Sequence, residues 1–161
     1  MPTALPQPLR NTRVLSLALN LPGPAALMRC VRMGAECTKL EPPPPPGYPS
    51  ADPMGVYSPA AYATLHQGVR VVHAHLKTPE GQAALHEALA RTDVLITSFR
   101  PSALTKLGLS WEALQVKYPR LSLVRIVGAA AERAEEPGHD LTYLADAGLV
   151  TGTEMPPTLY A

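Results

Sequence analysis

The stretch RVLSLALNLPGPAALMRCVRMGAECTKLE, residues 13–41, decides the fold. It opens with a short apolar run, residues 13–19, which is bounded by turn formers and is typical of a buried strand. The letters NLPGP break that run, and residues 25–33 then place apolar side chains at helical spacing until Gly34. Residues 36–41 have the pattern of a second strand. We therefore predict a strand–helix–strand unit here.

Strands and helices continue to alternate along the rest of the chain. Further strands are expected at residues 69–76, 93–99 and 121–128. Helices are expected at residues 58–68, 78–92, 102–108 and 110–118 and within 136–150, with Ser58, Thr78, Ser102, Ser110 and Asp140 as N-caps. The proline-rich segment 42–53 is expected to be loop. The alternation predicts an α/β, Rossmann-like fold with a mostly parallel sheet flanked by helices.

The totals exclude several classes of function. A length of 161 residues suits a single compact domain. The formal net charge is +1 with both signs spread along the chain, so no nucleic acid or anionic membrane is expected as a partner. No apolar run is long enough to cross a bilayer, and no secretory leader precedes residue 13, so we expect a cytoplasmic protein. Cys30 and Cys37 are expected to be reduced, buried thiols.

Ligands of such sheets bind outside the carboxyl ends of the strands. The first of these ends carries a Gly-Pro turn, which suits either a phosphate at a helix N-terminus or only a tight connection. The dinucleotide fingerprint G-x-G-x-x-G is absent. At the fourth end, Phe99, Arg100 and Lys106 would suit a purine ring and a phosphate, although a core Phe flanked by solvated cations is the simpler explanation on local reasoning.

Two histidine segments remain open on local reasoning. His73 and His75 would share one face of a strand, but no third ligand is evident, so no metal is expected. Asp140 is explained by a role as N-cap. His139 has no such role, and a neutral imidazole beside a helix N-terminus could accept a proton from a substrate; an ordinary surface histidine is the simpler alternative.

Five collinear segments together resemble one family. Residues 13–43, 75–85, 93–114, 118–128 and 137–149 match the order and spacing of the N-terminal part of family III CoA transferases. This CaiB/BaiF-like family includes formyl-CoA and carnitine CoA transferases and α-methylacyl-CoA racemase. The resemblance rests on five motifs: the Gly-Pro turn, KLEPP, HLKTPEG, SFRPSALTKLGL and PGHD.

The resemblance implies a CoA site across the strand ends, with coenzyme A entering as the acyl-CoA substrate and no metal. By matched position, Leu19, Leu21 and Pro22 would line the CoA channel. Ser98 and Phe99 would lie near the adenine or pantetheine arm, and Arg100 and Lys106 near the phosphates. His139 matches an acid–base residue of the racemase branch, and Asp140 stands beside it as its candidate catalytic neighbour. Racemisation is preferred to CoA transfer because Gly-His-Asp is intact.

The resemblance also bears on the extent of the chain. The family's nucleophilic Asp comes shortly after a Pro-Pro pair, here Pro156 and Pro157, and the sequence stops at Ala161. We therefore expect residues 1–161 to form a single α/β CoA-binding domain that is an incomplete large domain. Full-length members of the family are homodimers, but the resemblance does not lead us to expect a homodimer of this chain. The alternative is a non-catalytic remnant or assembly subunit of such an enzyme.

Overall fold

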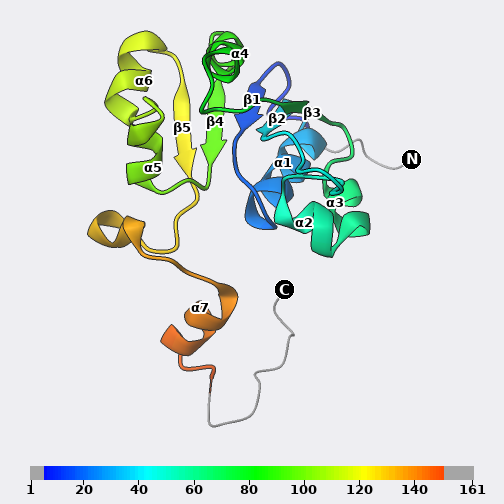
Figure 1. Ribbon diagram of the computed structural model, residues 1–161, viewed down its shortest axis with the longest axis vertical. Helices are drawn as coiled ribbons and strands as arrows, with labels where there is room; N and C mark the ends of the chain where they lie inside the picture. Colours follow the sequence, from blue (N-terminus) through cyan, green and yellow to red (C-terminus); the bar gives the residue numbers. More distant parts are fainter. Residues whose placement is uncertain (1–5, 151–161) are drawn as a thin grey trace. The chain divides into compact units, whose positions relative to one another are not determined.

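A computed structural model describes residues 6–150. Its centre is a five-stranded sheet in the order β3-β2-β1-β4-β5, and all four strand pairings are parallel (Figure 1). The strands are β1 (Arg13–Ser16), β2 (Glu36–Glu41), β3 (Val69–His73), β4 (Val94–Thr97) and β5 (Ser122–Arg125). The predicted α/β fold with a parallel sheet is confirmed.

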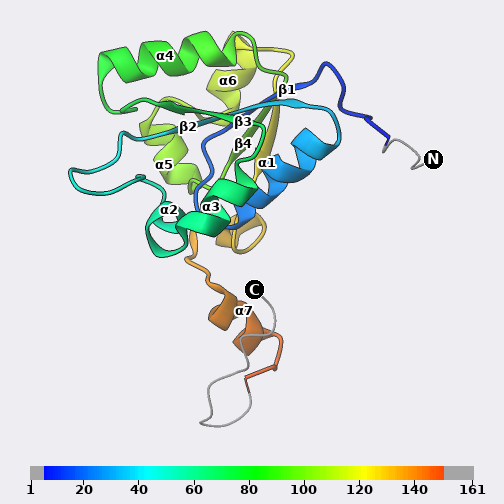
Figure 2. The ribbon, with the colours of Figure 1, turned by 90° about the vertical axis from the view of Figure 1, so that its right-hand side faces the viewer.

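Helices cover both faces of the sheet (Figures 1 and 2). They are α1 (Pro22–Arg32), α2 (Pro53–Tyr57), α3 (Pro59–Leu65), α4 (Pro79–Leu89), α5 (Pro101–Lys106) and α6 (Trp111–Lys117). The chain divides into two compact units, with the boundary between Ile126 and Val127. The second unit contains η1 (Ala131–Glu135), a 3-10 helix, and α7 (Asp140–Asp146).

The core has two parts because successive residues of a strand point to opposite faces. On β1, Leu15 packs with Leu85 of α4 and Leu104 of α5. Its neighbour Val14 packs on the other face with Leu27 of α1. The central strands are thus buried on both faces, as their continuous apolar runs predict.

Proline places the starts of the helices. Each of the five helices α1 to α5 begins with a proline, at a position where the ring's fixed φ suits the helix and no backbone donor is lost. This is why α1 begins at Pro22, three residues before the predicted start. It is also why a short helix, α2, begins at the last residue of the proline-rich segment; residues 42–52 contain neither helix nor strand.

Three of the five predicted N-caps, Ser58, Thr78 and Ser110, occupy the cap position, and two predictions are wrong. The Thr78 and Ser110 side chains accept hydrogen bonds from the backbones of Gly81 and Ala113. Ser58 precedes α3 but makes no such bond. Ser102 lies inside α5 because Pro101 already occupies the first turn. Asp140 is the first residue of α7, since the extended backbone of His139 makes that residue the cap position.

The two cysteines are free thiols on α1 and β2. Cys37 is buried, and Cys30 is half-buried. Burial, with the nearby Cys30 and Glu36, raises the pKa of Cys37 to about 12. Since the thiolate is the reactive form, Cys37 is inert at neutral pH.

Within residues 6–150, no helix combines the length and the apolar character needed to span a membrane.

Candidate functional site

The carboxyl ends of β1 and β4 lie together at one edge of the sheet. The Leu17 amide donates to the Ile96 carbonyl at 2.8 Å. Two residues further on, the Leu19 amide donates to Ser98 Oγ at 3.3 Å. Two of the predicted site residues, 79 positions apart in the sequence, are therefore brought into contact.

The turn between β1 and α1 carries the other predicted channel residues. Asn20 has φ of 61°, in the left-handed region that non-glycine residues seldom adopt. Leu21, which is 41% exposed, and the exposed Pro22 continue directly into α1. A side chain at Gly23 would overlap Ala18, so the first turn of α1 lies close against the end of β1. The turn therefore presents Leu21 and Pro22 to solvent.

The loop after β4 holds the remaining predicted contacts. Phe99 is half-buried, packs against the core on the α4 face, and donates its amide to Thr97 Oγ1 at 3.1 Å. Arg100 is exposed at the N-cap of α5, and Lys106 is exposed at its last residue. Phe99 therefore packs as a core residue. Arg100 and Lys106 are both accessible to an anion in solvent.

A buried cluster of charges, which the sequence did not predict, lies behind the turn. Lys39 Nζ is 3.0 Å from Glu41 Oε2 and 2.5 Å from Asp52 Oδ2. All three side chains are at most 1% exposed. Asp52 Oδ1 accepts the Asn20 amide at 3.0 Å. One sequence pattern could have indicated this cluster. Lys39 and Glu41 stand two residues apart in one predicted strand, which places their opposite charges on the same face.

Aromatic and polar groups complete this cluster. Tyr62 donates to Glu41 at 3.2 Å, and its ring lies 4.9 Å from Lys39 Nζ. Burial and the charge of Glu41 raise the pKa of Tyr62 to about 12. His66 stacks on Tyr62 with ring centroids 3.9 Å apart, and burial lowers the pKa of His66. Tyr62 is therefore tied to the cluster by its hydrogen bond to Glu41, and His66 joins it by stacking on Tyr62.

The expected face of two histidines does not form. β3 ends at His73, whose Nε2 lies 3.3 Å from Glu41 Oε1. His75 lies beyond the strand in the turn before α4, so the alternation that would align the two side chains does not reach it. Among residues 6–150, no group of three or more His, Cys, Asp or Glu side chains could hold a metal ion.

His139 belongs to the second unit. It is exposed at the N-cap of α7 and makes no side-chain capping bond, while its carbonyl accepts the Tyr143 amide at 3.0 Å. The Tyr143 hydroxyl lies where a side chain at Gly128 or Gly138 would stand, so a side chain at either position would require Tyr143 to move. The roles of His139 and Asp140 in catalysis stay predictions.

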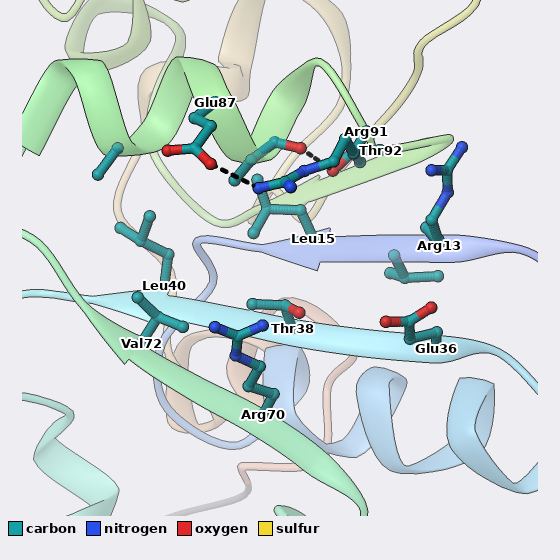
Figure 3. Close-up of a pocket in the computed structure, with 13 residues that line it drawn as sticks. Arg13, Leu15, Glu36, Thr38, Leu40, Arg70, Val72, Glu87, Arg91 and Thr92 are labelled. Atoms are coloured by element: carbon teal, nitrogen blue, oxygen red, sulfur yellow. Dashed lines mark hydrogen bonds and ion pairs between the residues drawn. The ribbon is translucent and has the colours of Figure 1, made fainter.

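A groove of about 460 Å³ crosses another part of the sheet (Figure 3). It lies over β1, β2 and β3 beside α4, with mixed charges such as Arg70 and Glu36 and the ion pair between Arg91 and Glu87 at 2.8 Å. No predicted site residue lines it.

Comparison with known proteins gives one family. Residues 9–160 match the sequence profile described as CoA-transferase family III. The succinate–glutarate CoA-transferase of Agrobacterium fabrum is 35% identical over 167 residues, which cover 97% of this chain and 41% of that protein. The human α-methylacyl-CoA racemase is 30% identical over 145 residues, 89% of this chain and 35% of the racemase.

The fold has a matching neighbour among solved structures. A CaiB/BaiF family protein from Brucella suis superposes with a TM-score of 0.78 at 27% identity, over 97% of this chain and 44% of that one. The chain spans 35–41% of the length of the two curated relatives described above.

Proposed function

Because this chain belongs to CoA-transferase family III, we propose that it binds a CoA thioester across the carboxyl ends of β1 and β4. The observation that carries the proposal is the hydrogen bond from the Leu19 amide to Ser98 Oγ, 3.3 Å long. It joins the two loops to which the family resemblance assigns the CoA channel. The family implies CoA thioester substrates, and the individual contacts are the proposal.

The proposed contacts divide by chemistry. Leu19, Leu21 and Pro22 offer an apolar wall to the pantetheine arm, and the exposure of the last two leaves that wall open. Arg100 and Lys106 offer positive charge to the phosphates near the solvent. Ser98 and Phe99, in the loop after β4, are proposed to lie near the adenine or pantetheine arm.

The proposed reaction uses the acidity of the carbon next to the thioester carbonyl. The imidazole of His139 takes the α-proton, and the electron pair left on carbon is delocalised into the thioester carbonyl. Inversion of the centre requires that a second acid return a proton on the opposite face. The resemblance assigns this second role to the family's Asp that follows the Pro-Pro pair, and Asp140 is proposed only as the neighbour of His139 at the site. The intact Gly-His-Asp sequence favours this racemisation.

CoA transfer is the second candidate. A carboxylate nucleophile accepts the acyl group as a mixed anhydride in that chemistry, and CoA leaves as the thiolate. The observation in its favour is the 35% identity to a succinate–glutarate CoA-transferase. The two reactions share the proposed CoA site and differ in the chemical step after the thioester has bound.

Titration calorimetry with CoA and acetyl-CoA tests binding. We expect heat at millimolar ligand or below, and Lys106→Ala should weaken binding about two- to fivefold, the effect of one exposed charge contact. The matched control is Lys117→Ala on α6, outside the proposed site, which should bind as the wild type does. Wild-type protein that gives no heat at millimolar ligand would contradict the proposal.

Exchange of the α-proton tests the chemistry. A 2-methylacyl-CoA incubated in deuterated water should incorporate deuterium with the wild type and lose that incorporation with His139→Gln. His86→Gln on α4 is the control and should retain exchange. A chain that binds CoA but exchanges no proton would contradict racemisation and leave CoA transfer and the non-catalytic subunit as the alternatives.

A further inference from the structure

We propose that the buried pair Lys39–Asp52 is a positioning device that holds the turn at Asn20 in the shape required for CoA. The inference rests on the proposed function, because the turn lies between the two proposed contacts Leu19 and Leu21. Neither Lys39 nor Asp52 is among the residues that the family resemblance assigns to the site.

Asp52 uses its two carboxylate oxygens for different tasks. Oδ1 accepts the Asn20 amide at 3.0 Å and the Met54 amide at 2.9 Å. Oδ2 accepts from Lys39 Nζ. One side chain therefore ties the β1–α1 turn to the start of α2 and to the middle of β2.

Lys39 sets the direction of that carboxylate. It is 0% exposed, and it lies between Asp52 and Glu41, which is itself fixed by Ser50 at 3.2 Å and Tyr62 at 3.2 Å. A buried carboxylate needs a paired charge to stay ionised, and an ionised acceptor makes the stronger hydrogen bond to an amide. The bond to Asn20 thus depends on Lys39.

Stability alone does not require such a cluster. Buried ion pairs are often no more stabilising than apolar side chains of the same volume, because removing the charges from water is costly. The cluster instead supplies a fixed geometry, and it fixes Asn20, whose backbone conformation needs support.

The φ of Asn20, 61°, lies in the left-handed region, which asparagine tolerates better than other residues with a side chain but still at a cost, so contacts from its surroundings stabilise the turn. Asp52 holds its amide, the Tyr57 hydroxyl lies 3.5 Å from its Oδ1, and Ser98 holds the neighbouring Leu19 amide. A turn fixed before binding does not lose conformational freedom when the ligand arrives, which raises affinity.

The test uses Asp52→Ser in the 161-residue chain. Serine is also a good N-cap, so α2 keeps its start, but the shorter side chain cannot reach both Lys39 and Asn20. Lys39 remains paired with Glu41. We expect amide hydrogen exchange of Asn20, measured by NMR, to become about tenfold faster or more, and the dissociation constant for CoA to rise by about tenfold.

Two further variants secure the interpretation. Ser110→Ala removes the N-cap of α6, far along the chain from the turn, and should change neither readout although it lowers stability. Asp52→Asn keeps the shape and one oxygen acceptor but loses the charge, so a smaller change of the same sign is expected. It serves as the test should Asp52→Ser fail to fold.

The outcomes separate the inference from the function. Asn20 exchange that stays slow in both Asp52 variants overturns the holding role. Faster exchange with unchanged CoA affinity overturns the positioning role, while binding by the wild type still supports the proposed function. Absence of CoA binding by the wild type overturns the proposed function, and with it the positioning role.

Discussion

At the scale of the residue, Gly81 shows how a missing side chain shapes the fold. A Cβ at this position would overlap the carbonyl group of His75 and stand 3.0 Å from its amide nitrogen. These are backbone atoms, which cannot swing aside as a flexible side chain can. The glycine is therefore what allows the first turn of α4 to lie against the turn that comes after β3.

We expect Gly81→Ala to lower the free energy of unfolding by about 2 kcal/mol or more, measured by urea denaturation, because the backbone must move apart. Gly47→Ala is the comparison. Gly47 has φ of 82° and no neighbour within 4 Å, so its substitution meets only backbone strain, at about 1 kcal/mol. Equal losses in the two variants would show that crowding at Gly81 is absent.

At the scale of the element, the stability of a helix start depends on whether a polar side chain accepts a hydrogen bond from the first turn. Thr78 and Ser58 stand in the same context, each directly before a proline that begins a helix. Thr78 has extended backbone and accepts the Gly81 amide at 3.2 Å, whereas Ser58, with φ of −147° and ψ of 69°, makes no capping bond. A hydroxyl residue before the first proline therefore stabilises α4 through a capping bond but does not do so in α3.

Thr78→Ala should accordingly cost about 1 kcal/mol of stability, and Ser58→Ala only a few tenths. Urea denaturation of both variants at one pH measures the difference. A Ser58 variant as unstable as the Thr78 variant would contradict this assignment of the caps.

The elements themselves were largely predictable. β2 has the predicted bounds 36–41, because the strand is bounded by a glycine turn before it and by prolines after it. β3 is shorter than predicted, since the apolar pattern continues past the point where pairing with β2 stops at His73. α2 was missed because its composition is that of the loop that precedes it.

At the scale of the whole molecule, two histidines make stability depend on pH. Burial lowers the pKa of His66, and burial together with the charge of Lys117 lowers the pKa of His86. The folded state therefore binds fewer protons at these sites than the unfolded state, whose histidines titrate near 6.5. Their contribution to stability is complete above that pH and is lost as pH falls through the lowered values.

Urea midpoints should accordingly decline as the pH is lowered below about 6.5, before the carboxylates titrate. The double variant His66→Gln/His86→Gln should show a shallower decline over the same interval, because neither site then binds a proton. An identical decline in the variant and the wild type would assign the effect to other groups.

The sequence by itself determined the class of fold, the order of its elements and most helix starts, because these depend on hydrophobic period, capping residues and proline, all of which act over a few neighbouring positions. The family resemblance also identified the two loops that meet through Leu19 and Ser98. Only the tertiary structure decided the strand order and the burial of Lys39, Glu41 and Asp52 behind the turn at Asn20. Those contacts join residues far apart in the chain, and whether a charge is buried and which partner it meets depend on packing that no local pattern contains.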